Sequence, residues 1–231
     1  MPLKTVFLDA GGVLVYPNWT RVCAALDRHG VRADPGALAA AEPRAKRTLD
    51  VGRTINATND AGRGWLYFNL ILDAAGVARS ESTDAALSEL QTFHNTSNLW
   101  EYVPPHVPGV LASLVGRGLR LVVVSNANGT LRHLFTRLEL DRHFVCVLDS
   151  HEEGVEKPDP RIFAAALARS GADAASTIHV GDFYQIDVIG ARAAGIRGVL
   201  LDEGGLYEDA DCPRVRSLGE LQRRIEEGEF E

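Results

Sequence analysis

The feature that most constrains the fold of this chain is a short apolar run that recurs along it, with helical segments between the copies. The first run is Val6-Phe7-Leu8, and the others lie near residues 119–125, 144–148, 177–180 and 199–201. Contiguous apolar residues of this kind are typical of strands that are buried on both faces. Because strands and helices alternate, the sequence predicts an α/β fold in which a parallel sheet carries helices on both faces.

The segment between the first and second apolar runs has the periodicity of helices. Four helices are expected to begin near Asn18, Asp34, Asn59 and Thr83. Pro43 is expected to interrupt or kink the second of them. We therefore predict an inserted helical-bundle cap domain over residues 16–103, and a core domain formed by residues 1–15 and 104–231.

The composition is that of an ordinary globular protein, with 45% hydrophobic and 24% charged residues among 231. The longest apolar run is far shorter than a membrane span, and the first residues lack the layout of a signal peptide, so we expect a cytoplasmic protein with no membrane contact. A formal net charge of −7 argues against a nucleic-acid partner. Cys23, Cys146 and Cys212 form no CxxC pair and predict neither a disulfide framework nor a zinc site.

Polar residues follow several of the predicted strands. Asp9, Ser125 and Asp182 come at the ends of three strands, and Lys157 lies in the loop after another. In a parallel sheet these ends share one edge, where ligands bind. Carboxylates suit a magnesium ion, and hydroxyl and ammonium groups suit a phosphate, so we predict a site for both. The chain has only three lysines, which makes each of them worth inspecting: Lys4, Lys46 and Lys157.

Four motifs contain these polar residues: Asp9-Ala10-Gly11-Gly12-Val13, Ser125-Asn126, Lys157-Pro158-Asp159-Pro160 and Gly181-Asp182-Phe183-Tyr184-Gln185-Ile186-Asp187. In this order they resemble the haloacid dehalogenase-like hydrolase superfamily, and the resemblance covers nearly the whole chain. It implies a Rossmann-like core, with the helical insert as a cap of the superfamily's first type.

By this resemblance Asp9 is the nucleophile of a phosphatase, which takes the phosphoryl group as an aspartyl-phosphate that water then hydrolyses. Ser125 and Asn126 are expected to donate hydrogen bonds to the phosphoryl oxygens. Lys157 is expected to stabilise the charge on Asp9 and on the transferring group.

The resemblance also implies Mg²⁺ as the cofactor. Its expected ligands are Asp9, the backbone carbonyl of Gly11 and Asp182, and Asp187 is expected to support the metal shell. The ion would offset repulsion between the anionic nucleophile and the anionic phosphate.

Gly11 departs from the phosphatase pattern, which has a second Asp at this position as the general acid and base. A positioned acid or base typically contributes about 10²–10⁴ in rate. Three explanations are open: another group such as His94 or His106 supplies the proton, the leaving group is too acidic to need one, or turnover is weak or absent.

Two other functions fit the same residues. The dehalogenase branch also lacks the second Asp, and its motifs resemble Asp9-Ala10 and Ser125-Asn126, so Asp9 could displace a halide from carbon without metal. Asp182 and Asp187 favour the magnesium site instead. A binding or regulatory protein that kept the fold and lost turnover is the third interpretation.

A cap that closes over the site favours a small phosphorylated metabolite as substrate. Specificity is then expected from the predicted cap domain, which carries four arginines of interest: Arg44, Arg47, Arg53 and Arg63. The sequence identifies neither the metabolite nor the oligomeric state.

Overall fold

The computed structural model describes residues 2–57 and 60–230, and its centre is a sheet of six parallel strands in the order β3-β2-β1-β4-β5-β6. The strands are β1 (Thr5–Leu8), β2 (Arg120–Ser125), β3 (Cys146–Asp149), β4 (Thr177–Gly181), β5 (Arg197–Leu201) and β6 (Arg214–Val215). This topology confirms the predicted α/β fold class. β6 was not predicted because two residues are too short to give a hydrophobic pattern.

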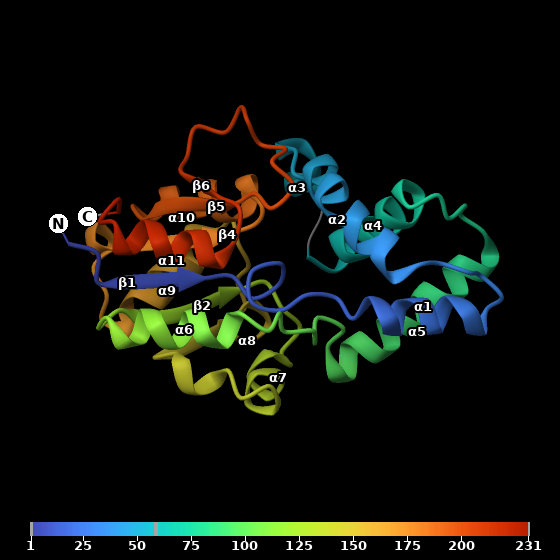
Figure 1. The fold of residues 1–231 in the computed structure, drawn as a ribbon, viewed down its shortest axis with the longest axis horizontal. Coiled ribbons are helices and arrows are strands. Elements are labelled where there is room, and N and C mark those ends of the chain that lie inside the picture. The colour runs from blue at the N-terminus through green and yellow to red at the C-terminus, as the bar shows by residue number, and fades with distance from the viewer. Residues whose placement is uncertain (1, 58–59, 231) are drawn as a thin grey trace.

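The sheet is covered on both faces, as its contiguous apolar strands require. Val6 and Leu8 of β1 pack in one cluster with α6 (Val107–Gly116) and α11 (Leu218–Glu226). Phe7, which points the other way, packs with α9 (Pro160–Ser170) and α10 (Ile189–Ala193) (Figure 1). Successive side chains of a strand alternate between faces, so a strand between two helix layers must be apolar throughout. The shorter elements of this part are α7 (Leu131–Arg137), η1 (Asp141–His143), α8 (Ser150–Glu153), η2 (Ala174–Ser176) and the π-helix η3 (Tyr184–Val188).

Between β1 and α6 the chain forms five helices within the described residues, and they lie to one side of the sheet (Figure 1). They are α1 (Trp19–Arg28), α2 (Pro35–Leu49), α3 (Gly52–Ala57), α4 (Asp60–Ala74) and α5 (Glu81–Ser97). We call residues 19–100 the helical insert. Most of its buried side chains form a cluster of their own, separate from the two clusters beside the sheet. The domain boundaries expected at residues 16 and 103 stay a prediction.

The helix starts follow the capping signals of the sequence. The Asn18 side chain accepts from the backbone N–H of Arg21, and Asp34 accepts from that of Ala37 at 2.7 Å. The interruption considered at Pro43 does not occur, because α2 runs through it as one helix. Apolar packing of α2 in the insert offsets the backbone hydrogen bond that proline cannot donate. Helix α3 was not predicted, and Asn59, the expected start of α4, lies outside the described residues.

A membrane-spanning helix would need about 20 predominantly apolar residues. Across the part of the chain that the structure describes, no helix is both long enough and apolar enough to span a bilayer.

Candidate active site

The loop after β1 brings the backbone close to the carboxyl end of the sheet. Gly12 has a φ of +73°, which glycine adopts without strain, and its N–H donates to the carbonyl of Val15. A Cβ atom on Gly12 would lie 2.0 Å from Oδ2 of Asp182 and 2.7 Å from Nζ of Lys46. Position 12 therefore has room for glycine alone while these two side chains hold their places.

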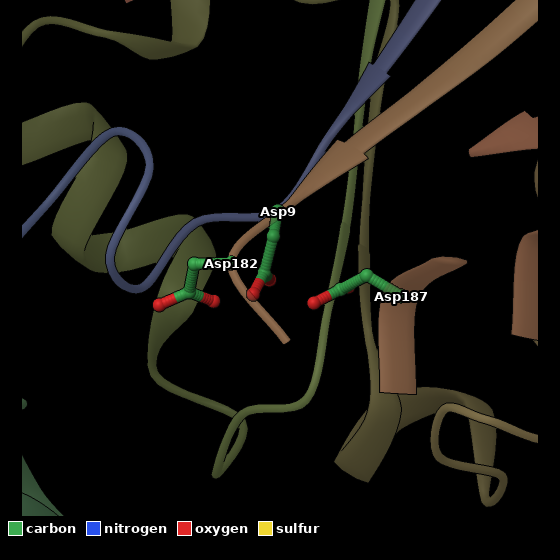
Figure 2. A group of neighbouring side chains, drawn as sticks. All are labelled: Asp9, Asp182 and Asp187. Carbon is green, nitrogen blue, oxygen red and sulfur yellow. The ribbon is translucent and has the colours of Figure 1, made fainter. Parts of the chain in front are cut away.

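Three aspartates meet at the edge of the sheet. Asp9 follows β1, Asp182 follows β4, and Asp187 lies on η3, and their side chains point toward one another (Figure 2). One carboxylate oxygen from each lies within 4.8 Å of the others. The structure thus brings together three of the four carboxylates that the sequence motifs contain, and the fourth, Asp159, caps the start of α9.

Lys157 lies between two of these carboxylates and is almost fully buried. Its Nζ is 3.0 Å from Oδ1 of Asp9 and 2.6 Å from Oδ1 of Asp187. Burial alone would disfavour the ammonium, but the charges of Asp187 and Asp9 outweigh it and raise the pKa of Lys157. Lys157 is therefore a fixed positive charge beside the Asp9 carboxylate.

Asp187 is held by the protein on both of its oxygens. Oδ1 also lies 2.9 Å from Nε2 of His179, and Oδ2 accepts the backbone N–H of Phe183 at 3.1 Å. Although burial acts in the opposite direction, the charge of Lys157 and the contact with His179 hold the pKa of Asp187 well below its usual range. Asp187 therefore stays ionised and fixes the position of Lys157.

Ser125 and Asn126 lie at the end of β2, next to the aspartates. Ser125 is buried and lines the same cavity as Asp9. The Asn126 amide donates from Nδ2 to the carbonyl of Lys157 at 3.0 Å, and its Oδ1 accepts the Lys157 N–H at 2.7 Å. Asn126 therefore positions the backbone of Lys157, a contact that the spacing of the motifs did not reveal.

Lys46 of α2 also reaches this site, and sequence reasoning did not place it there. Its Nζ lies 2.7 Å from Oδ2 of Asp182 and 2.8 Å from Oε1 of Glu42. Tyr67 donates its hydroxyl to the same Glu42 oxygen at 2.7 Å. The one sequence signal for Lys46 was the scarcity of lysine.

Burial of Asp182 raises its pKa to about 7. The positive charge of Lys46 lowers this pKa, but the negative charges of Asp9 and Asp187 raise it, so Lys46 offsets the effect of burial only in part. An additional positive charge at this edge would therefore favour the ionised form of Asp182.

A cavity of about 170 Å³ separates the sheet edge from the helical insert, and both contribute side chains to it. Of the two histidines considered as proton donors, His94 lines this cavity, while His106 is exposed at the start of α6 and is absent from the described lining. Arg63 also lines the cavity and pairs with Glu156 at 3.3 Å.

Two of the other insert arginines considered for specificity, Arg44 and Arg47, are absent from the described lining of this cavity. Arg47 pairs with Asp209 at 2.9 Å, and Arg44 is exposed. The Arg53 side chain lies outside the described part of the chain.

Comparison with known proteins agrees with this fold. The family model described as haloacid dehalogenase-like hydrolase matches residues 3–195. The chain therefore belongs to the haloacid dehalogenase-like hydrolase family.

Individual relatives carry different names. Haloacid dehalogenase-like hydrolase domain-containing protein 3 of Danio rerio is 39% identical over 120 residues, which are 50% of this chain and 50% of that protein. A phosphoserine phosphatase of Thermus thermophilus is 39% identical over 119 residues, 51% of this chain and 48% of that protein. The solved structure of a 2-haloacid dehalogenase from Pseudomonas syringae is 25% identical with a TM-score of 0.59, and the match covers 98% of this chain and 99% of that one. The chain spans about half the length of the curated relatives it matches.

Proposed function

We propose that this protein is a Mg²⁺-dependent phosphatase of a small phosphorylated metabolite, with Asp9 as the nucleophile. The observation that carries the proposal is the pairing of Lys157 with both Asp9 and Asp187 beside the carboxylate of Asp182. This arrangement keeps a nucleophilic carboxylate at the end of a rigid strand and sets a permanent cation next to it. The phosphatase name of one relative supports the same reaction.

In this mechanism an oxygen of Asp9 attacks phosphorus while the bond to the leaving group breaks, and water then cleaves the aspartyl-phosphate. Lys157 stabilises negative charge on the transferring oxygens, and Asp187 keeps that ammonium protonated and in place. Ser125 is the hydroxyl donor for the phosphoryl group. Asn126 acts through Lys157, whose backbone it holds by two hydrogen bonds.

The side chains present fit a magnesium ion, because buried carboxylate oxygens are the donors that this hard cation prefers. We propose that Asp9, the carbonyl of Gly11 and Asp182 hold the ion, with Asp187 supporting the shell. A bound magnesium ion supplies positive charge that reduces repulsion between Asp9 and the phosphate. The helical insert, which forms the opposite wall of the cavity, acts in this proposal as the cap of the site.

A dehalogenase is the second candidate, supported by the likeness to a solved dehalogenase and by Gly11, since a departing halide needs no acid. The Asp182 carboxylate argues against it. An anionic haloacid bound beside Asp9 would face this further buried carboxylate, which only Lys46 pairs among the described contacts. A binding protein without turnover is the third candidate, and it would hold magnesium and phosphate without releasing product.

The test is phosphate release from an aryl phosphate, an acyl phosphate and several sugar phosphates, each with magnesium and with chelator. We expect magnesium-dependent release that Asp9→Asn lowers by about 10⁴-fold or more, the scale of losing a nucleophile. The matched control is Asp84→Asn, which changes an exposed carboxyl on α5 and should leave the rate unchanged. Halide release from haloacids, without phosphate release, would establish the dehalogenase. If neither phosphate nor halide is released, the binding protein without turnover is the candidate that remains.

A further inference from the structure

The space beside Gly11 is filled by Trp100 of the helical insert. A Cβ atom built on Gly11 would lie 3.3 Å from Cδ1 and 3.4 Å from Nε1 of the Trp100 indole, tighter than most real Cβ contacts. A longer acidic side chain at position 11 would require the indole to move. The place of the missing general acid is therefore taken by the edge of an indole ring, whose N–H can donate a hydrogen bond but is too weak an acid to protonate a leaving group.

Trp100 is held in this place by its neighbours. Its ring packs against Phe68 and His94 with centroids at 5.7 and 5.3 Å, and against Tyr67 at 5.9 Å. Its backbone N–H donates to Oδ1 of Asn98 at 3.0 Å. Aromatic contacts of this kind stabilise a ring beyond the effect of the area that they bury. The indole is a fixed part of the cavity wall.

The rest of the insert wall is also largely apolar. Phe68, Leu87 and Leu90 line the cavity from the insert, and Phe183 lines it from the loop after β4. The wall also has polar side chains, and each already has a protein partner. Asn98 uses its amide nitrogen on Thr130 and its oxygen on the Trp100 N–H. Lys46 pairs with Asp182 and Glu42, Arg63 pairs with Glu156, Gln91 donates to Asn95, and His94 accepts from the Leu99 N–H. A sugar placed here would lose water from hydroxyls that find few partners, at a cost for each unpaired group, whereas a flat apolar ring would lose none.

We propose that the substrate is a phosphate ester or anhydride whose organic group is aromatic or otherwise apolar and whose leaving group is acidic, a phenol or a carboxylic acid. This inference rests on the proposed function. The phosphoryl group lies at Asp9, Ser125 and Lys157, and the organic group lies against Trp100 and Phe68.

The reaction balances without an acid at position 11. The bond from Asp9 to phosphorus forms as the bond to the leaving group breaks, and the leaving group departs with that electron pair as a phenolate or carboxylate. Water then attacks phosphorus, the bond to Asp9 breaks, and both protons of the water leave with the inorganic phosphate. No oxidant, reductant or second substrate is needed.

The first experiment compares phosphate release among substrates of similar size and different leaving groups, using the unaltered protein with magnesium. Nitrophenyl phosphate and benzoyl phosphate have acidic leaving groups, whereas benzyl phosphate and glucose 6-phosphate have alcohols. We expect kcat/KM for the acidic leaving groups to exceed that for benzyl phosphate by about 10²–10⁴, the contribution that a positioned acid would otherwise supply. If kcat/KM for benzyl phosphate or glucose 6-phosphate equals that for the substrates with acidic leaving groups, the inference is overturned, while the proposed phosphatase function still stands.

The second experiment tests the wall directly. Trp100→Ala should raise KM for nitrophenyl phosphate by about tenfold to hundredfold, as expected for loss of an apolar contact of ring size, and Trp100→Phe should recover most of it. Trp19→Phe is the control, since Trp19 packs against Phe68 in the insert cluster and is absent from the described cavity lining. An unchanged KM in Trp100→Ala, with the fold intact by circular dichroism, would contradict the assignment.

A binding measurement distinguishes failure of the proposed phosphatase function from failure of the proposed aromatic ligand. If no substrate releases phosphate, the proposed function fails, and titration calorimetry with phenylphosphonate and methylphosphonate still tests the cavity. Binding of the phenyl compound about tenfold or more tightly supports an aromatic ligand. Equal affinity for the two phosphonates overturns the proposal that the cavity binds an aromatic group.

Discussion

The two walls of the cavity hold their functional side chains in different ways. On the sheet wall, Asp9 and Ser125 end neighbouring parallel strands, whose paired backbones fix where the side chains start. On the insert wall, Lys46 and Trp100 are held by side-chain contacts between elements that are distant in sequence. The difference teaches that the reactive groups at the strand ends, Asp9 and Ser125, are placed by backbone hydrogen bonding between strands. The wall that faces the organic part of the ligand depends on side-chain packing instead. Changes on the sheet wall should therefore affect folding and chemistry together, and changes on the insert wall should affect binding more.

The largest effect is expected at Lys157 on the sheet wall. Lys157→Met leaves Asp9 and Asp187 buried without their ammonium, and breaking a buried ion pair in this way costs about 3–5 kcal/mol in the free energy of unfolding. Urea unfolding in chelator measures it. The matched control is Lys4→Met, an exposed lysine expected to change stability by less than about 0.5 kcal/mol. A loss below about 1 kcal/mol at Lys157 would show that the sheet wall is no more tightly coupled to folding than the surface.

An intermediate effect is expected at Lys46, where the two walls meet. Lys46→Met removes the ammonium that pairs with Asp182 and raises the pKa of this carboxyl further, so the comparison is made at mildly alkaline pH, where Asp182 is ionised in both proteins and a metal ion no longer competes with the ammonium for it. We expect magnesium to bind about tenfold more tightly, which corresponds to about 1.4 kcal/mol. Titration calorimetry of metal-free protein measures the affinity, with Lys4→Met again as control. Weaker magnesium binding in Lys46→Met would indicate that the insert wall supports the metal site instead of competing with it.

The smallest effect is expected from the pH dependence of His94 in the insert. Burial lowers the pKa of His94, and its Nδ1 accepts the backbone N–H of Leu99 at 3.1 Å, a contact that a protonated ring would lose. The unfolded chain takes up this proton as the pH falls below about 6.5 while the folded chain does not, so the stability held above that pH is lost on acidification.

Between pH 7 and pH 5.5 this histidine should contribute to the loss in the free energy of unfolding, by no more than about 1 kcal/mol, the limit for a ring that stays neutral in the folded protein. The measurement is the difference between the unaltered protein and His94→Asn, which removes the titrating ring and leaves the other ionisable groups in place. If the free energy of unfolding falls equally with pH in the two proteins, His94 is not held in its neutral form by the fold.

The local signals of the sequence determined five of the six strands of the described sheet, several helix starts and the aspartates and serine of the sheet wall. Buried parallel strands need contiguous apolar residues, and the residue after each strand must lie at the same edge, so Asp9, Ser125 and Asp182 could be grouped from their order alone. The insert helices α1 and α2 followed from their caps at Asn18 and Asp34.

Only the tertiary structure brought Lys46 to Asp182, Trp100 to Gly11 and the Asn126 amide to the Lys157 backbone. These contacts join residues separated by 136, 89 and 31 positions, as their numbers give directly. No periodic pattern encodes them, because they depend on how α2 and the end of the insert pack against the loops at the sheet edge. Strand order sets the reactive edge through backbone geometry, whereas the opposite wall exists only once two separately patterned parts of the chain have packed together.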